Sequence, residues 1–156
     1  MKIIEISTGK IFPIEIIPVK KQDYESITQE RFFFDWKTEN ELEIYKLLII
    51  GENDILGLIS IERIPSEWRI HIRLLTVSVE NMGKNKQYDE IAGNLIAFIS
   101  KIAIKEFAEL ACVSLIPKTS IANHYIKKYN MNRTGKTLSL EVPEILNLIN
   151  QYDNDK

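Results

Sequence analysis

The stretch of the chain with the clearest capacity for chemistry runs from Leu74 to Phe107. It joins an apolar segment, L-L-T-V-S-V-E, to a polar loop, N-M-G-K-N-K-Q-Y-D-E, and then to a long apolar segment, I-A-G-N-L-I-A-F-I-S-K-I-A-I-K-E-F. If the last segment is a helix, the N–H groups of its first turn have no acceptor within the helix, and the helix dipole favours negative charge there. We therefore predict that the turn from Gln87 to Asn94 binds an anion, such as the phosphates of a cofactor.

Other kinds of chemical site are excluded by residues that the sequence lacks. The chain contains no G-x-S-x-G, P-loop or H-E-x-x-H motif. Its two histidines are His71 and His124 and its single cysteine is Cys112, which exclude a histidine-rich metal site and an internal disulfide. Cys112 lies in the apolar run A-C-V-S-L-I, which favours burial as a small hydrophobic residue over a reactive thiol. We predict no metal.

The composition is that of an ordinary globular protein. The chain has 156 residues, of which 45% are hydrophobic and 27% charged, and we expect a single domain over residues 1–152 with a disordered acidic tail at 153–156. The formal net charge of -2 argues against a nucleic-acid-binding protein that relies on a basic surface. No window approaches the ~20 apolar residues that span a bilayer, and the first residues lack a signal-peptide pattern. We expect a cytoplasmic protein with neither a nucleic-acid nor a membrane partner.

A long helix should position the turn. Apolar residues recur through Ile91–Phe107 in a wide stripe at positions 91, 92, 95, 96, 98, 99, 102, 103 and 107, a pattern typical of packing on a sheet. Shorter helices are expected over Lys21–Asp35, where Asp23 can act as the cap, from Thr119 or Ser120 to Tyr129, and over Glu144–Tyr152.

The remaining apolar runs predict a sheet. The expected strands are Ile14–Val19, Tyr45–Ile50, Ile55–Ile64, Arg69–Val79, Ala111–Ile116 and Leu138–Val142. The second and third of these should form a hairpin, and Asn130–Thr137 should be a turn. This order predicts a mixed α+β fold, with a parallel strand pair joined through the long helix.

The order of elements and the turn before the long helix together resemble the GNAT family of acetyl-CoA-dependent N-acetyltransferases. In that family the pyrophosphate sits on a loop with the pattern Q/R-x-x-G-x-G/A. The run Q-Y-D-E-I-A matches this pattern at Gln87 and Ala92, and Gly93 follows. The family's preceding strand, roughly L-x-V-x-P, corresponds to Leu75–Val79. The resemblance spans about Ile14 to Val142 and implies a central mixed, mainly antiparallel sheet flanked by helices.

The resemblance also implies that acetyl-CoA is the cosubstrate. The strand before the polar loop would pair with the pantetheine arm, and the turn into the helix would hold the pyrophosphate. The cofactor-binding residues that the resemblance implies are Thr76, Val77, Ser78, Val79, Gln87, Tyr88, Ile91, Ala92, Gly93 and Asn94.

The turn departs from the family pattern at Glu90, which stands where the pattern has glycine. A glycine lets the backbone approach a phosphate closely, whereas a glutamate adds bulk and a negative charge. The preceding loop, Asn81–Lys86, is also longer than usual. Its Gly83, Lys84 and Lys86 could supply replacement amides and positive charge, or could form a solvated loop.

The second departure concerns the general acid. The family pattern N-x-x-A-x-x-x-Y-x-x-x-G-F, laid on this chain, falls on Thr119, Ala122, Ile126, Asn130 and Met131. Ile126 therefore occupies the position of the tyrosine that protonates the departing thiolate, and a shift of one residue turns a helical side chain by about 100°. The resemblance implies that Tyr125 is the proton donor if the helix register differs slightly. The alternative is that Tyr125 and Tyr129 are packing residues.

Acetyl transfer to an amine also needs a base and a donor for the thioester oxygen. A backbone N–H near Val77 is the candidate donor. Glu62 and His71 are the candidate bases, because both lie on predicted strands and can accept a proton. Two simpler explanations remain, in which Glu62 pairs with Arg63 and His71 lies on a solvated strand face. The predicted catalytic residues are therefore Tyr125, Glu62 and His71.

These observations leave two functions open. The first is an N-acetyltransferase that moves an acetyl group from acetyl-CoA to an unidentified small-molecule or peptide amine. The second is a catalytically inactive GNAT-like module that acts as an acyl-CoA sensor or a protein-interaction domain, which Glu90 and the displaced tyrosine favour. A homodimer is compatible with the resemblance, and the sequence indicates no face for it.

Overall fold

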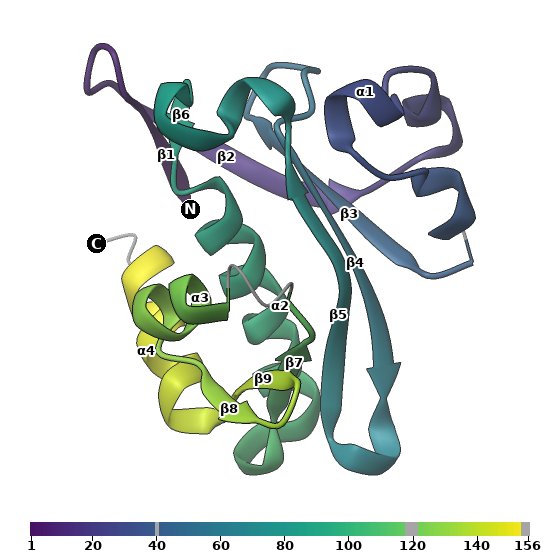
Figure 1. Cartoon of the computed structure of the whole chain (residues 1–156), viewed down its shortest axis with the longest axis vertical. Coiled ribbons are helices and arrows are strands. Elements are labelled where there is room, and N and C mark those ends of the chain that lie inside the picture. Colours follow the sequence, from purple (N-terminus) through teal and green to yellow (C-terminus); the bar gives the residue numbers. More distant parts are fainter. Residues whose placement is uncertain (40, 118–121, 154–156) are drawn as a thin grey trace. The chain divides into compact units, whose positions relative to one another are not determined.

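A computed structural model describes residues 1–39, 41–117 and 122–153 (Figure 1). In this part of the chain, nine strands form one sheet in the order β6-β1-β2-β3-β4-β5-β7-β9-β8. Strands β5 and β7 pair in parallel, and the other pairs whose register is known are antiparallel. The prediction of a mixed α+β fold with a mainly antiparallel sheet and one parallel pair is confirmed.

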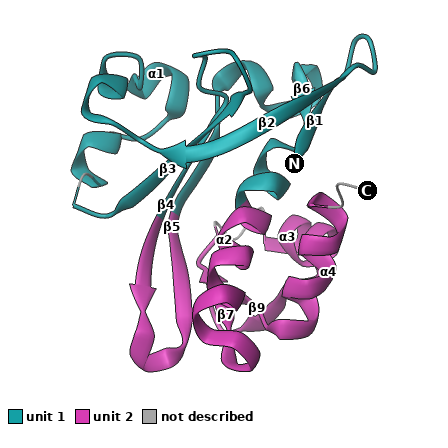
Figure 2. Ribbon diagram, turned by 180° about the vertical axis from the view of Figure 1, so that it is seen from behind, with its two compact units in different colours: residues 1–60, 74–95 teal, residues 61–73, 96–156 magenta. Residues whose placement is uncertain are grey.

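The chain divides into two compact units (Figure 2). Unit 1, teal in Figure 2, comprises residues 1–60 and 74–95, and unit 2, magenta, comprises residues 61–73 and 96–156. Each unit is made of two separate stretches of sequence. Strands β4 (Gly57–Ile64) and β5 (Arg69–Val77) and helix α2 (Ile91–Phe107) each contribute residues to both units.

Unit 1 is built on antiparallel strands. They are β1 (Lys2–Glu5), β2 (Ile11–Pro18), β3 (Glu43–Ile49) and the two-residue β6 (Tyr88–Asp89), with the adjoining ends of β4 and β5. The predicted hairpin is present, since β3 and β4 are neighbours in the sheet and the Leu56 N–H donates to the Leu47 carbonyl at 2.9 Å. The apolar core of this unit is a cluster of Ile27, Phe32, Trp36, Ile44, Leu48, Ile55 and Leu58.

The prediction of a single helix over Lys21–Asp35 is wrong. The segment instead forms the 3-10 helix η1 (Lys21–Glu25), the short helix α1 (Gln29–Phe32) and the 3-10 helix η2 (Trp36–Glu39). Thr28 restarts the helix, because its side chain accepts a hydrogen bond from the Arg31 N–H, and Phe33 ends it in a left-handed conformation at φ 71°. Burial of Phe32 and Trp36 in the core of unit 1 sets these breaks.

The sequence analysis also missed three strands, which are β1, β6 and β8. Strand β1 pairs with both β2 and β6, and β8 (Asn132–Thr134) pairs with β9 (Thr137–Leu140) across Gly135 at φ 63°. The prediction of a turn over residues 130–137 is therefore wrong in part, because strand β8 occupies Asn132–Thr134 and only the tight turn at Gly135 separates it from β9. All three missed strands have four residues or fewer, too few to show a strand pattern in the sequence, and they are recognised only by their pairing with other strands.

Unit 2 contains the predicted parallel pair. The register runs from Arg69↔Cys112 to Ile72↔Leu115 between β5 and β7 (Cys112–Leu115), and β7 pairs antiparallel with β9. Helix α2 has the bounds that the sequence predicts, and α4 (Val142–Tyr152) begins two residues earlier than expected. Helix α3 covers Ala122–Tyr129, so the predicted cap at residues 119–120 lies outside the described residues.

Two predictions remain, the disordered tail at residues 153–156 and the absence of a membrane-spanning segment. Residues 154–156 of the expected tail lie outside the described residues. Among the helices of the described residues, none combines the length and the apolar character needed to cross a bilayer.

Candidate functional site

The turn into α2 takes a conformation that glycine usually supplies. Glu90 has φ 78°, in the left-handed region, at the position where the family pattern has glycine. Its N–H donates to Asp89 Oδ1 at 2.9 Å, and the same oxygen accepts from Lys86 Nζ at 2.7 Å. The charge of Lys86 is therefore used within the turn, where it partly balances the Asp89 carboxylate.

The first turn of α2 presents backbone donors. Within the described part of the chain, the N–H groups of Ile91, Ala92 and Gly93 have no acceptor outside their own helix. The Ile91 side chain is buried and Ala92 is half-buried. This turn keeps the donor pattern that an anion needs, although the Asp89 carboxylate already occupies the N–H group that precedes it.

Asn94 anchors the first turn of α2 from inside. Its side chain is fully buried, and Nδ2 donates to the Glu90 carbonyl at 2.6 Å and to the Lys2 carbonyl of β1 at 2.8 Å. The Asn94 N–H also donates to the Glu90 carbonyl, at 3.2 Å. Asn94, one of the predicted cofactor residues, thus ties the helix to β1 through its side chain.

The long loop before the turn is organised by Asn81, which the sequence analysis did not single out. Its side chain is buried, with Nδ2 donating to Ser78 Oγ at 2.8 Å and Oδ1 accepting from the Tyr88 N–H at 2.8 Å. The bridge joins the residue after β5 to β6, and a buried amide of this kind holds a loop in one conformation. The sequence gives only one indication of this role, which is that Asn81 is an amide residue within a polar loop.

The ends of the loop are held by contacts from other parts of unit 1. The Gln87 N–H donates to the Glu80 carbonyl at 3.1 Å, and the Gln87 carbonyl accepts from the Ile6 N–H at 3.0 Å, while the Gln87 side chain is exposed. The Tyr88 ring meets the Phe12 ring edge-on, with centroids 5.9 Å apart. Backbone contacts therefore place Gln87 and Tyr88.

An arginine on α1 holds the beginning of the same loop. Arg31 Nε donates to Glu80 Oε1 at 2.6 Å, and its Nη2 lies 2.9 Å from Asp54 Oδ1. Both partners are partly exposed, so each ion pair is worth on the order of 1 kcal/mol or less. Arg31 therefore orients the loop more than it stabilises the unit.

The carboxyl end of β5 has one edge directed away from β4. The Ser78 N–H donates to the Leu56 carbonyl at 2.8 Å on the β4 side. Because backbone groups alternate between the two edges of an extended chain, the N–H of Val77 points to the opposite edge. The ladder with β7 covers Arg69–Ile72, so Val77 lies beyond it in the register. Thr76 is buried and Val79 exposed.

Gly57 allows β4 to run directly against α2. A Cβ atom at Gly57 would lie 2.7 Å from Ile91 Cγ2, 3.0 Å from Leu95 Cδ1 and 3.3 Å from the Thr76 carbonyl oxygen. The first of these distances is too short for any Cβ atom unless the Ile91 side chain or its helix moves, and the other two are tighter than ordinary contacts. Gly57 therefore sets the position of the first turn of α2 within unit 1, a role that the sequence analysis missed.

His71 belongs to a polar cluster in unit 2. Its Nδ1 lies 2.8 Å from Ser114 Oγ, to which Arg69 Nη1 also donates at 2.7 Å. Burial lowers the pKa of His71 below its usual value, and the Arg69 guanidinium acts in the same direction against the opposing charge of Glu62. The imidazole is therefore neutral at pH 7. If Nδ1 carries the proton and donates to Ser114, the lone pair of Nε2 can accept a proton.

Glu62 and Tyr125 differ in their surroundings. Glu62 is exposed on β4, and its neighbour Arg63 pairs with Glu106. Tyr125 is half-buried on α3, with ring centroids 5.9 Å from His124 and 5.8 Å from Tyr129, and burial raises its pKa. The phenol therefore stays protonated at neutral pH, as a proton donor must. Among the described residues, no hydrogen bond joins Tyr125 to Glu62 or His71.

The predicted residues thus separate into two sets. All the predicted cofactor-binding residues lie in unit 1, and Tyr125, Glu62 and His71 all lie in unit 2. No cluster of histidine, cysteine and acidic side chains among the described residues could hold a metal ion.

Comparison with known proteins supports the fold. No protein-family model matches the sequence, and no curated protein is similar to it. Among solved structures, a chimera of the spermidine N-acetyltransferase SpeG of Vibrio cholerae with hSSAT is similar at a TM-score of 0.65 and 13% identity, over 86% of this chain and 98% of that one. A protein from Bacillus anthracis assigned as a streptothricin acetyltransferase, solved with acetyl coenzyme A, is similar at a TM-score of 0.62 and 13% identity, over 83% and 99%.

A third similar structure is also that of an acetyltransferase. Nourseothricin acetyltransferase has a TM-score of 0.54 at 10% identity, over 81% of this chain and 97% of that one. At such low identity the likeness shows the fold alone. The chain has the fold of the GNAT N-acetyltransferases, and the predicted resemblance is confirmed at that level.

Proposed function

We propose that this chain, which has the fold of the GNAT N-acetyltransferases, transfers an acetyl group from acetyl-CoA to an amine. The acceptor is an unidentified small molecule or peptide, and the reaction takes place in the cytoplasm. The similar structures include enzymes for spermidine and streptothricin and one solved with acetyl coenzyme A, which supports the reaction class and the cosubstrate. The proposal is compatible with a homodimer.

The left-handed conformation of Glu90 is the observation that carries this proposal. A glutamate in that region costs on the order of 1 kcal/mol relative to glycine. The chain nevertheless takes this conformation, which glycine adopts most readily, at the position where the family pattern has glycine. That conformation leaves the N–H groups of Ile91, Ala92 and Gly93 directed out of the helix, as a pyrophosphate requires.

The fit to a pyrophosphate has one opposing feature. The Asp89 carboxylate accepts the Glu90 N–H and adds negative charge beside the first turn, and Lys86 balances it only in part. Binding would therefore need Asp89 to turn away with Lys86. Both side chains are about one-third exposed, so this movement does not disturb the core.

Acetyl-CoA would supply the thioester that carries the acetyl group. Thr76, Ser78 and Val79 would line the pantetheine arm, and Val77 would donate its backbone N–H to the carbonyl oxygen, where negative charge develops. Gln87, Tyr88, Ile91, Ala92 and Gly93 would form the pyrophosphate turn, which Asn94 supports from inside.

Tyr125 would donate a proton to the leaving thiolate, and Glu62 or His71 would accept the proton of the attacking ammonium group. Neutral His71 suits a base, because a group that is already protonated cannot accept a proton. Cys112 is an unsuitable covalent carrier, since burial raises the pKa of its thiol. The amine would therefore attack the thioester directly.

One observation favours the alternative function, a catalytically inactive module that senses acyl-CoA or binds another protein. Asp89 and Glu90 place two carboxylates directly before the start of α2, and Glu90 stands where the family pattern has glycine. If these charges exclude the cofactor, the fold would serve as a scaffold for protein interaction. If the cofactor binds but no amine consumes it, the sensor role is favoured.

Three measurements distinguish these functions. Calorimetric titration of the purified chain with acetyl-CoA should give a saturable heat, and mass spectrometry of the freshly purified protein should detect bound CoA. Release of free thiol from acetyl-CoA, measured over a panel of amines, then separates enzyme from sensor. Absence of binding at millimolar acetyl-CoA would reject both roles that involve the cofactor.

A further inference from the structure

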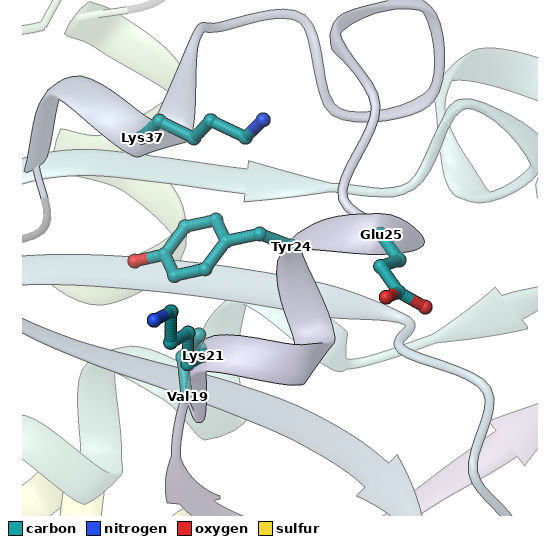
Figure 3. A pocket seen from close by; sticks show the side chains of 5 residues that line it. All are labelled: Val19, Lys21, Tyr24, Glu25 and Lys37. Atoms are coloured by element: carbon teal, nitrogen blue, oxygen red, sulfur yellow. The ribbon is translucent and has the colours of Figure 1, made fainter.

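A cavity of about 590 Å³ lies in unit 1, and none of its lining residues is among those assigned to the cofactor. Its lining side chains are Val19, Lys21, Tyr24, Glu25 and Lys37. Figure 3 shows the Tyr24 ring reaching between Lys37 on one side and Lys21 on the other, with Glu25 towards the opposite end. The volume falls in the range of small-molecule sites.

The wall of this cavity is anchored to the core of unit 1. Val19, Tyr24 and Phe34 pack against the apolar cluster that contains Trp36. Trp36 Nε1 donates to the Phe32 carbonyl at 3.1 Å, and the Val19 N–H donates to the Ile44 carbonyl at 2.9 Å. The cavity is therefore preorganised, although it is formed by short helical turns.

A nearly buried ion pair fixes the 3-10 helix that carries Tyr24. Asp23 Oδ2 accepts from Lys46 Nζ at 2.7 Å and from the Lys20 N–H at 2.7 Å. Burial disfavours the ionised carboxylate, but these hydrogen bonds outweigh it, and the pKa of Asp23 is lowered. The charge of Lys46 is thus already neutralised within the protein.

Lys21 and Lys37 have no such partner. Both are exposed, and neither forms an ion pair with any residue that the structure describes. Among the lining residues that the structure describes, Glu25 is the one carboxylate, so these side chains carry one net positive charge, whereas the whole chain has a net charge of -2. Two ammonium groups on either side of a phenol ring favour an anion with a planar or apolar body.

We propose that this cavity binds a small organic anion whose planar or apolar part lies along Tyr24 and Val19 and whose acidic groups contact Lys21 and Lys37. None of the lining residues is among those that the proposed acetyl transfer assigns to the cofactor or to catalysis. A polycationic ligand is disfavoured, because both ammonium groups would repel it.

The test uses three probes of matched shape on the full chain. Isophthalate carries two carboxylates on a benzene ring, isophthalamide is its neutral counterpart, and m-xylylenediamine carries two ammonium groups. Titrations followed by amide NMR shifts should show saturable binding of isophthalate, with shifts concentrated over residues 19–37. Isophthalamide should bind at least 10-fold more weakly, and m-xylylenediamine should not bind there.

Two double variants separate local contacts from overall charge. Lys21→Gln with Lys37→Gln should weaken isophthalate binding at least 10-fold, whereas Lys105→Gln with Lys136→Gln removes the same charge from unit 2 and should leave binding unchanged. Equal weakening in both double variants would overturn the proposal. Tighter binding of the diamine, or no isophthalate binding at 10 mM, would also overturn it. Displacement of isophthalate by acetyl-CoA would also overturn it, because the cavity would then belong to the cofactor site.

Discussion

The turn from Gln87 to Asn94 in unit 1 and the helix that carries Tyr125 in unit 2 place different demands on the sequence. The turn would act through backbone N–H groups, and Glu90 takes a left-handed conformation at the position where the family pattern has glycine. Helix α3 would act through a single side-chain hydroxyl, and the family register places Ile126 where that hydroxyl is needed. A one-residue shift moves a side chain by about 100° around the helix.

From this difference we expect that a function built from the backbone tolerates a change of side chain better than a function built from one side chain. The tertiary contacts of Asn81, Asn94 and Gly57 support the turn from three sides within unit 1. Tyr125 instead has aromatic neighbours on its own helix. We therefore expect variants of the turn to alter affinity and variants of α3 to alter only the rate.

The largest effect is expected from a charge placed directly on the turn. Ala92→Glu should weaken acetyl-CoA binding by about 1,000-fold, because the new carboxylate would occupy the space of the phosphates and repel them. Calorimetry measures the affinity. The control Asn123→Glu adds the same charge to an exposed position of α3 and should leave binding unchanged. Unchanged affinity in Ala92→Glu would show that the phosphates lie elsewhere.

Removal of the phenol hydroxyl tests the other region. Tyr125→Phe should lower kcat about 100-fold and leave the KM for acetyl-CoA unchanged, because a general acid contributes to the chemical step. Tyr129→Phe removes a hydroxyl from the same aromatic cluster and should have little effect on kcat. Equal rates for the wild type and Tyr125→Phe would assign Tyr125 to packing.

The support from β4 can be tested at Gly57. Gly57→Ala should cost roughly 1 to 3 kcal/mol in the free energy of unfolding and weaken acetyl-CoA binding about 10-fold, since the added methyl group must displace Ile91 and Leu95. Chemical denaturation and calorimetry give the two values. Gly135→Ala, at φ 63° with no atom within 4 Å of the new Cβ, should lose stability without losing affinity. Loss of affinity in both would point to a general effect of instability.

Restoring the glycine of the family pattern at position 90 should increase both the stability and the affinity for acetyl-CoA. Glu90→Gly should raise the free energy of unfolding by about 1 kcal/mol, because glycine relieves the left-handed conformation, and should tighten acetyl-CoA binding several-fold by removing a carboxylate. Ala108→Gly relieves a similar conformation, at φ 50°, without a change of charge, so it should affect stability alone. A destabilised Glu90→Gly would indicate that the glutamate makes a structural contact worth more than the strain.

The smallest effect is a change in pH dependence. If His71 is the base, kcat/KM should fall as the pH drops below 6.5, because burial and Arg69 place the pKa of the imidazole below that value and protonation removes the base. His71→Gln should abolish this fall together with most of the activity. An unaltered profile in His71→Gln would assign the base to Glu62, and Glu62→Gln is the matched variant.

Regular patterns in the sequence were sufficient to predict the longest elements. Helix α2 has the predicted bounds because its apolar stripe extends over many turns, and strands β3 and β5 lie within their predicted ranges apart from terminal residues. The helix over Lys21–Asp35 was predicted wrongly because its polar residues allow several local structures, and the burial of Phe32 and Trp36 selects among them.

The sequence by itself determined that a polar turn precedes a long amphipathic helix, and that the surrounding strands form a mixed sheet. These features follow from periodicity and composition, which act over neighbouring residues. Only the tertiary structure decided the left-handed path at Glu90, the bridge made by Asn81 and the close passage of Gly57 beside Ile91. Each of these depends on atoms from distant parts of the chain, and their free energies appear only when those parts are packed together.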